Sequence, residues 1–278
     1  MANTINQPDG SSASPLNPPA PAAASASSWT ERYTVDFSAQ SAHDFSSGSV
    51  ALDGVEWTVG NDAQATAVEI VNGSGLELSP STSTDLRWYT AGTINAPRVA
   101  ATIQSGSNPL YSSLGITQAF AFQAIIEPGT ELGANYDEWG ILLTNAATTY
   151  YATSCRQFDS ATFSGGSPTI GNYLLRSVNT ARGAVVGSAE AATHKFFELV
   201  YYPGGTVVAS SSAASDFVEP LSATTFQKFV TTSPGTTSTG SSVPFKNTDM
   251  YAAFYIANYG SSTAFKAVVK KCRILTLD

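Results

Sequence analysis

Apolar and polar side chains alternate with a two-residue period in short stretches of this sequence, and this constrains the fold most. The longest alternating stretch is 264–277, and stretch 118–127 places Phe120, Phe122 and Ala124 on one face. Successive side chains of a strand point to opposite faces of a sheet, so this period predicts half-buried strands. A 3.6-residue period is suggested only briefly, near 213–229. The sequence therefore predicts an all-β protein.

Turn-forming residues separate the alternating stretches at short intervals. Asp53-Gly54 and the Pro-Gly-Gly run at 203–205 predict β-hairpins, and the Ser/Thr/Gly tract at 231–242 predicts a long surface loop. The expected strands are 32–37, 50–59, 67–71, 75–78, 85–89, 98–103, 118–127, 139–144, 149–158, 173–178, 196–202, 206–210, 250–257 and 264–277. Many short strands at this spacing favour an antiparallel two-sheet jelly-roll β-sandwich, here formed by residues 29–278.

Residues 1–28 differ from the rest and predict an extended N-terminal arm. They contain a Ser/Ala/Asn background, one charged residue, Asp9, and almost no large apolar side chain. Such a segment cannot bury enough surface to offset its ordering entropy by itself. The arm is either a linker or a tether that becomes ordered on a partner. The residues expected to contact that partner are Pro15, Leu16, Pro18, Pro19 and Pro21.

The charge of the chain argues against several partners. The formal net charge is −8, and only 13 Lys and Arg are present. Nucleic acid is not an expected partner, because phosphate binding needs many cations on one face. The one basic cluster, Lys270, Lys271 and Arg273, is interpreted as a solvated strand edge. No stretch resembles a membrane span or a signal peptide, so we expect synthesis in the host cytoplasm.

Cysteine and histidine residues give no metal site in the sequence. Cys155 and Cys272 lie in separate expected strands, and they form either a disulfide or two buried free thiols. His43 and His194 are far apart, and neither lies near a nucleophile motif, so both are expected at the surface. No cofactor is expected.

The order of elements from Gln118 onward resembles a concanavalin A-like lectin/glucanase jelly roll, the sandwich of laminin-G-type modules, legume lectins and several glycosidase families. The likeness is carried by the F-x-F-x-A-x-I strand at 120–126, the Y-D-x-W-G-I-L-L stretch at 136–143 and Tyr150-Tyr151. It continues through the strand, Gly turn and strand at 197–207, then Phe254-x-Ile and the closing strand at 265–275. The resemblance implies the fold more strongly than a function.

The carboxylates do not form the constellation that glycosidases of this fold use. Those enzymes carry paired acids on one strand face, as in E-x-D-x-x-E, and this sequence has no such motif. The nearest group is Glu127, Glu131, Asp137 and Glu138, in which the two adjacent acids are expected on opposite faces. We interpret all four as solvated loop acids, and we predict no catalytic residue. They could supply a Ca²⁺ site, although no D-x-D-x-D/N run is present.

Sugar binding needs exposed aromatic rings beside hydrogen-bonding groups. Six aromatic residues are candidates for such rings: Trp57, Trp88, Tyr89, Trp139, Tyr173 and Tyr259. Trp139, followed by Gly-Ile-Leu-Leu, is a core candidate. Trp88 and Tyr89 are adjacent, so one of them faces outward on a strand, and Tyr259 lies in an expected loop. Trp88, Tyr89 and Tyr259 are therefore the candidate carbohydrate-binding residues.

Two classes of function fit these observations. The first is a non-enzymatic structural protein of a bacteriophage virion, either a capsid decoration protein or a tail or fibre component. Its partners would be other virion proteins or copies of itself, as a homo-oligomer or lattice component. The alternative is a carbohydrate-binding module that recognises a cell-surface glycan. The charge-poor Ser/Thr/Gly-rich sandwich and the arm favour the first class.

Overall fold

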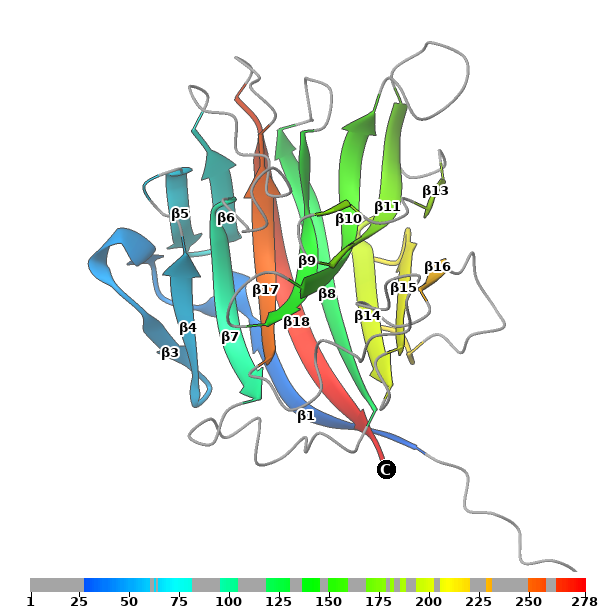
Figure 1. Cartoon of the computed structure of the whole chain (residues 1–278). Helices are drawn as coiled ribbons and strands as arrows, with labels where there is room; N and C mark the ends of the chain where they lie inside the picture. Colours follow the sequence, from blue (N-terminus) through cyan, green and yellow to red (C-terminus); the bar gives the residue numbers. More distant parts are fainter. Residues whose placement is uncertain are drawn as a thin grey trace, which may run out of the picture.

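The computed structural model describes residues 28–60, 63, 65–81, 96–104, 119–130, 137–145, 150–159, 169–178, 181–182, 186–188, 194–202, 206–220, 229–231, 250–258 and 264–278. Within these ranges two antiparallel sheets face each other, and each sheet has nine strands (Figure 1). The prediction of an all-β, antiparallel two-sheet sandwich is confirmed.

Sheet A contains the first and the last strands of the sandwich. Its order is β16-β15-β14-β8-β18-β6-β5-β2, and β1 pairs with β18 beside β6. The strands are β1 (Trp29–Asp36), β2 (His43–Asp44), β5 (Ala65–Val71), β6 (Gly75–Pro80), β8 (Phe120–Thr130), β14 (Phe196–Tyr202), β15 (Thr206–Ser212), β16 (Phe229–Thr231) and β18 (Lys266–Leu277).

Sheet B has the order β12-β11-β10-β9-β17-β7-β4-β3, with β13 paired to β11. The strands are β3 (Val50–Leu52), β4 (Val55–Gly60), β7 (Arg98–Gln104), β9 (Glu138–Asn145), β10 (Tyr150–Asp159), β11 (Thr169–Val178), β12 (Ala181–Arg182), β13 (Val186–Ser188) and β17 (Met250–Ala257). Two short 3-10 helices, η1 (Phe37–Ala39) and η2 (Phe45–Ser47), follow β1 and β2.

The β3–β4 hairpin turns where the sequence predicts it. Asp53 and Gly54 both have positive φ, 49° and 82°. Two successive residues with positive φ match the right-handed twist of paired strands, and Asp-Gly favours this conformation. The expected strand at 85–89 and the rest of the loop after Thr231 lie outside the described residues.

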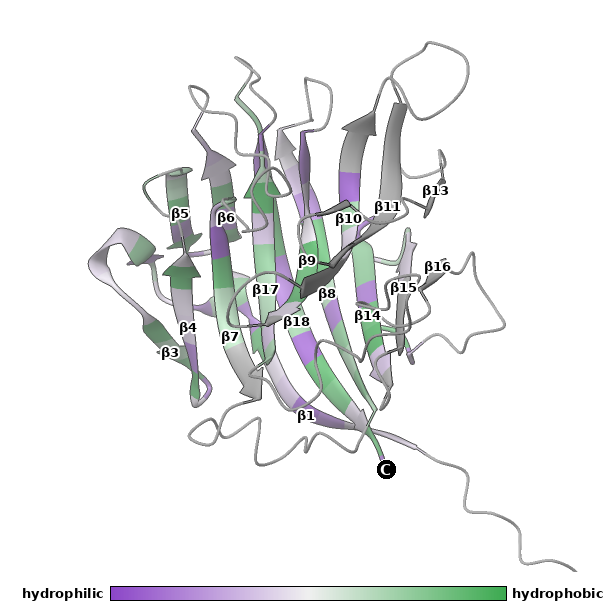
Figure 2. Cartoon of the chain, viewed as in Figure 1, coloured by the Kyte–Doolittle hydropathy of each residue, from purple (hydrophilic) through white to green (hydrophobic). Residues whose placement is uncertain are grey.

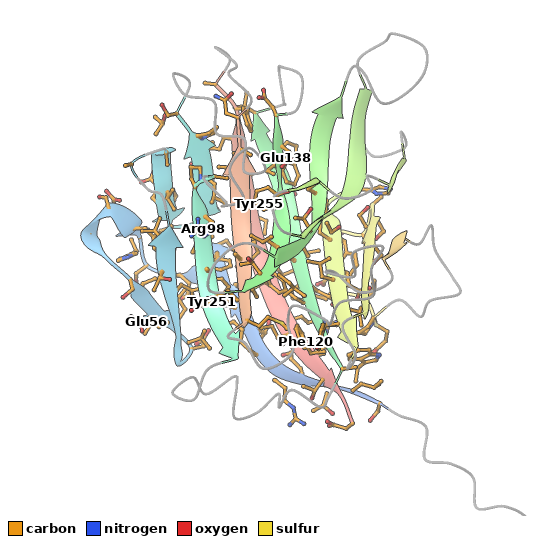
Figure 3. All side chains as sticks on the ribbon, viewed as in Figure 1. Glu56, Arg98, Phe120, Glu138, Tyr251 and Tyr255 are labelled. Atoms are coloured by element: carbon orange, nitrogen blue, oxygen red, sulfur yellow. The ribbon has the colours of Figure 1, made fainter. Side chains whose placement is uncertain are left out.

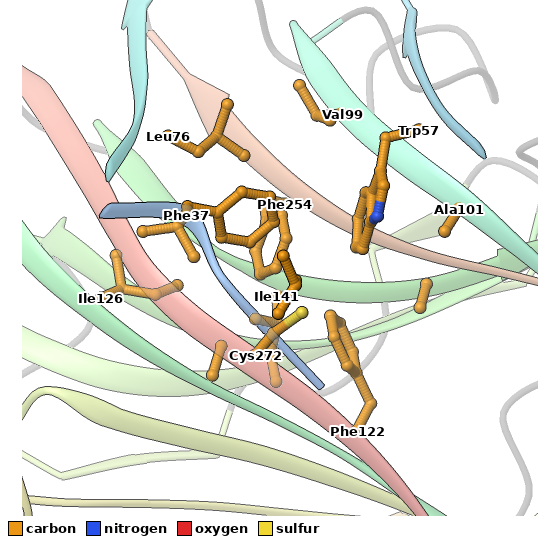
Figure 4. Close-up of a cluster of buried hydrophobic side chains, with 14 of the residues drawn as sticks. Phe37, Trp57, Leu76, Val99, Ala101, Phe122, Ile126, Ile141, Phe254 and Cys272 are labelled. Carbon is orange, nitrogen blue, oxygen red and sulfur yellow. The ribbon is translucent and has the colours of Figure 1, made fainter. Parts of the chain in front are cut away.

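The space between the sheets is filled by one large apolar core (Figure 4). Trp57 from sheet B stacks on Phe254 with ring centroids 5.5 Å apart, and Phe37 meets both rings edge-on. Phe122 contacts Phe254 from sheet A. Figure 2 shows the apolar and polar alternation along strands that lets one face of each sheet enter this core. Trp139 is fully buried, as its sequence context predicts.

Candidate functional site: two outer faces and two ends

The outer face of sheet B carries an Arg–Tyr row near one end of the sandwich. Tyr255 of β17 pairs directly with Arg98 of β7 and with Gly140 of β9, so their positions share one face. Arg98 in turn pairs with Gly60 of β4. A Cβ at Gly60 would lie 2.8 Å from the Arg98 guanidinium carbon, so glycine leaves the space that this guanidinium occupies. Tyr251 adds a second ring on the same face, because it lies an even number of residues before Tyr255 on β17.

Small residues surround these rings on the outer face. Ala100, Ala253 and Ala257 belong to the same buried cluster as Tyr255, and Tyr251 packs against it. Figure 3 shows Arg98, Tyr251, Tyr255 and Glu138 on the strands of sheet B. Burial raises the pKa of the Tyr255 hydroxyl, and the nearby Glu138 carboxylate raises it further. Burial also lowers the pKa of the Arg98 guanidinium.

Two acids at the start of β9 are buried, although the sequence is interpreted as placing them in solvent. Asp137 is 0% exposed and Glu138 is 1% exposed, so neither is a solvated loop acid. The error arises because Glu138 begins a strand in the middle of sheet B, where it pairs with Ala257 and Gln157. Asp137 and Glu138 both make polar interactions. Glu127 lies inside β8, which continues to Thr130, whereas Glu131 lies outside the described residues.

The predicted carbohydrate-binding residues Trp88, Tyr89 and Tyr259 also lie outside the described residues, but their flanking residues do not. Asn258 donates a hydrogen bond from Nδ2 to the Ser81 carbonyl at 2.8 Å. The Ile256 amide donates to the Pro97 carbonyl at 3.1 Å. The described residues that flank 82–95 and 259–263 are therefore adjacent at one end of the sandwich. We call this end, marked by Ser81, Pro97, Asp137 and Asn258, the rim.

The outer face of sheet A carries a row of polar side chains that are hydrogen-bonded to one another. Arg273, Gln123, Glu198 and Ser210 are directly opposite one another across β18, β8, β14 and β15. Arg273 Nε donates to Gln123 Oε1 at 2.7 Å, and Gln123 Nε2 donates to Glu198 Oε2 at 2.5 Å. Ser210 Oγ donates to Glu198 Oε1 at 3.0 Å. Gln123 and Glu198 are both 0% exposed, so the row forms a buried hydrogen-bonded chain.

Residues 213–220, here called the strap, cover this polar row. The Val218 carbonyl accepts hydrogen bonds from Arg273 Nη2 at 2.7 Å and Gln123 Nε2 at 3.1 Å. The Phe217 ring lies 4.8 Å from the Arg273 guanidinium carbon and 5.0 Å from the Lys271 ammonium. Asp216 forms an ion pair with Lys271. The brief helical period near 213–229 does not produce a helix in the described part of that segment.

The basic cluster is also corrected by the structure. Lys270 and Lys271 are not on a strand edge, because β18 pairs with β8 on one side and with β1 and β6 on the other. The pairing of β18 with β8 shifts register between Val269 and Lys271. Lys270 contacts Glu127 and the Ser74 carbonyl. These lysines therefore attach neighbouring segments to a central strand.

The opposite end of the sandwich holds the root of the arm. The Asp278 amide donates to the Ser28 carbonyl at 3.0 Å. The Asp278 carboxylate accepts from Thr30 Oγ1 at 2.6 Å and from Arg32 Nη2 at 2.9 Å. Trp29 packs on the small outer cluster of sheet A that contains Leu275. The expected arm contacts Pro15, Leu16, Pro18, Pro19 and Pro21 lie outside the described residues.

Neither cysteine forms a disulfide, and both thiols are buried. His43 and His194 are half-buried: His43 Nε2 lies 3.1 Å from the Gly48 carbonyl, and His194 Nδ1 lies 3.0 Å from Ser211 Oγ. Within the described part of the chain, no three His, Cys, Asp or Glu side chains gather as metal ligands. In the same ranges no helix has the length and apolarity of a membrane span.

Sequence reasoning did not identify Arg98, Tyr255, Gln123 or Glu198. A usable signal was present for two of them. Tyr251 and Tyr255 are separated by an even number of positions in a strand, so they share a face, and Ala253 between them leaves room. Glu198 is the one charged residue in the run Phe196–Tyr202, and a charge inside such an apolar strand indicates a buried polar partner. The pairing across strands needed the structure.

No family model matches the chain, and no curated protein matches it. Solved structures show similarity. A mutant of the GH43 protein BlXynB from Bacillus licheniformis aligns with a TM-score of 0.53 and 14% identity over 87% of this chain and 39% of that chain. Xyloglucan PUL GH43B from Bacteroides ovatus aligns with a TM-score of 0.49 and 13% identity over 85% and 39%. The CBM2 module of the evolved Dit of Lactobacillus casei BL23 phage J-1 aligns with a TM-score of 0.47 and 13% identity over 90% and 97%.

The similarity to the GH43 protein BlXynB bears on architecture alone, because the identity is low. The chain spans about two fifths of the length of the GH43 protein BlXynB. The order of the strands and the similarity to that structure are consistent with a concanavalin A-like sandwich. The fold thus defines a class, the antiparallel two-sheet β-sandwiches, within which function depends on the site.

Proposed function

We propose that the chain is a non-enzymatic, lectin-like structural protein of a bacteriophage virion, a capsid decoration protein or a tail or fibre component. It attaches through its N-terminal arm and presents the rim of its sandwich outward. One observation carries this proposal: the root of the arm and the rim lie at opposite ends of β18. That strand has 12 residues, so the two ends are roughly 36 Å apart at about 3.3 Å per residue.

The attachment end fixes the position of Ser28, the residue from which the arm starts. Ser28 is hydrogen-bonded to Asp278, and β1 is paired with β18 from Trp29 onward. A partner bound by the arm, another virion protein or a second copy, would therefore sit at this end. In this proposal the protein is made in the host cytoplasm and is located on the released particle.

A second function, carbohydrate recognition, is favoured by the rim. Ser81 and Asn258 are hydrogen-bonded to each other. Ser81 precedes the segment with Trp88 and Tyr89, and Asn258 precedes Tyr259. Arg98, which is half-buried, lies on the outer face of sheet B next to these strand ends, whereas the Tyr255 ring beside it is buried and is not available to a sugar. Aromatic rings beside hydrogen-bonding groups are the usual components of a sugar site. A glycan would then be bound at the end that faces away from the particle.

The attachment proposal is tested by replacing residues 1–28 with a Gly/Ser linker of equal length. Incorporation into particles should be lost, while the thermal unfolding transition of the sandwich stays unchanged, because residues 1–28 have almost no large apolar side chain to bury. A chain that keeps Pro15, Pro18, Pro19 and Pro21 and has its first 14 residues replaced serves as a control for length and composition. Normal incorporation of the full replacement would refute the arm as the attachment.

The carbohydrate proposal is tested on a glycan array with Trp88→Ala, Tyr89→Ala and Tyr259→Ala. Each should weaken binding by about fivefold, since stacking and ring contacts contribute on the order of 1 kcal/mol each. Trp29→Ala, an aromatic at the arm end, should leave binding unchanged. Absence of binding to any polysaccharide at millimolar concentration would refute carbohydrate recognition and leave the attachment proposal standing. Bound polysaccharides should release no reducing sugar, as expected for a non-enzymatic protein.

A further inference from the structure

The outer edge of β5, at the side of sheet A, is only partly paired. On its inner side β5 pairs with β6 along most of its length. On its outer side the short strand β2 pairs with Glu69 and Ile70 alone, through Asp44 and His43. Among the described residues, 65–68 have no strand partner on this edge. Alternate residues of a strand direct their N–H and C=O groups to each edge, so backbone groups without a ladder partner face outward here.

A hollow of about 370 Å³ follows this edge. Five consecutive residues of the strand, 65–69, line it, together with Ala63, Asp44 and Ser46. Because consecutive side chains point to opposite faces, a hollow lined by all five lies along the edge and not on one face. Its strand lining includes two alanines, Ala65 and Ala67, and small side chains leave space beside the backbone.

The hollow has a negative border. Asp44 and Glu69 are opposite each other in the β2–β5 pair and both line the hollow. A hydrogen bond from the Ser46 amide lowers the pKa of Asp44, so this carboxyl is ionised at neutral pH. The two acids should discourage the addition of uncharged or acidic strands to this edge, because charged side chains on an edge oppose unspecific strand pairing. A cationic strand would be attracted.

We propose that the outer edge of β5 is a docking site for an extended, basic peptide segment of a partner protein, bound by β-strand addition. The incoming strand would continue the line of β2 and form main-chain hydrogen bonds with 65–68. A Lys or Arg side chain of this segment would lie next to Asp44 and Glu69. The chain's own arm does not have this chemistry, because residues 1–28 contain Asp9 as the one charged side chain and no Lys or Arg.

The proposal is tested with three synthetic peptides and the full-length chain, by isothermal titration calorimetry. The first peptide alternates threonine and valine between two terminal lysines, the second has glutamates in place of the lysines, and the third is the lysine peptide with every internal amide N-methylated. The lysine peptide should bind, the glutamate peptide should bind at least about tenfold more weakly, and N-methylation should abolish binding because it removes the main-chain donors.

Variants of the chain complete the test. Glu69→Lys should weaken binding of the lysine peptide about tenfold, and its fold is favoured because position 69 faces Glu77 across the strands. Asp44→Asn should act in the same direction. Glu56→Lys, an acid on β4 that is hydrogen-bonded to Ser49, is the matched control and should have no effect. Equal binding of the lysine and glutamate peptides, or no binding at millimolar concentration, would overturn the proposal. Self-association that disappears when residues 1–28 are removed would overturn it in favour of the arm as occupant.

Discussion

The outer faces of the two sheets differ in how their polar groups are satisfied. On sheet A, the row from Arg273 to Ser210 forms a continuous hydrogen-bonded chain, and the strap covers it. On sheet B, Tyr255 is set among alanines, and Arg98 lies over Gly60 near the rim. The first face is an interlocked polar network, in which each member depends on its neighbours. On the second face Tyr255 and Arg98 are separated by small residues and Glu138 is buried beside them, so a change that keeps the large ring in place should be tolerated better.

Glu198→Ala should produce the largest loss of stability, because it breaks the middle of the chain on sheet A. Gln123 Nε2 and Ser210 Oγ would lose this shared acceptor at a site with no solvent. Unsatisfied buried groups of this kind should lower the free energy of unfolding by about 3 kcal/mol. Urea unfolding of the purified chain measures this, with Glu219→Ala, an exposed acid of the strap, as control. A loss below about 1 kcal/mol would show that the row is not interlocked.

Phe217→Ala should have the next largest effect, on the cover of the same face. It removes the ring that lies over Lys271 and Arg273. Two cation–π contacts and the lost burial should amount to about 1.5 kcal/mol. Hydrogen exchange should rise in 213–220 and remain unchanged in β17. Unchanged exchange in the strap would mean that the Val218 carbonyl holds it without the ring.

Tyr255→Phe should have a smaller effect, below about 1 kcal/mol, because the ring and its contacts with the alanines of sheet B remain. The loss of the hydroxyl also removes a titrating group whose pKa is raised by burial. Urea unfolding at neutral pH compares this variant directly with Glu198→Ala. If the two losses were equal, the contrast between the two faces would be wrong.

Glu127→Gln, on β8 of sheet A, should have the smallest effect on stability, and this effect appears only at low pH. The hydrogen bond from Lys195 lowers the pKa of Glu127 below its ordinary value of 4.5. A group whose folded pKa is lowered stabilises the fold above the unfolded pKa, and this contribution is lost as pH falls through the folded value. Glu127→Gln should therefore reduce the fall in stability below pH 4.5 by less than about 0.5 kcal/mol, since the pair is partly exposed. Thermal melts from neutral pH down to about pH 3, below the folded pKa, test this, and an unchanged slope would contradict it.

The strands could be predicted from the sequence because their period is local. The inward face of β8, the hairpin at Asp53-Gly54 and the burial of Trp139 all follow from neighbouring residues. The error at Lys271 has a different origin. In the sequence, lysines in a strand indicate an exposed edge, but β18 is a central strand with a register shift, and its Lys271 is paired with Asp216.

The sites could be predicted less well, because they depend on register between distant segments. Gln123 and Glu198 are 75 residues apart, and no local pattern shows that β8 and β14 place them opposite each other. The same holds for Arg98 and Tyr255, which meet through the pairing of β7 with β17. A single charged residue in an apolar strand indicates a partner, but its identity depends on the topology.

The position of β18 has a consequence for how the chain folds during synthesis. This strand is the last in the sequence, yet it pairs with β1, β6 and β8. Until it leaves the ribosome, these three strands have no common neighbour, and the inner face of sheet A stays incomplete. Contacts of such long sequence separation form late and slow the search for the native state. Sheet A therefore closes only after residues 266–277 have been synthesised, and a nascent chain arrested before Lys266 should remain sensitive to protease.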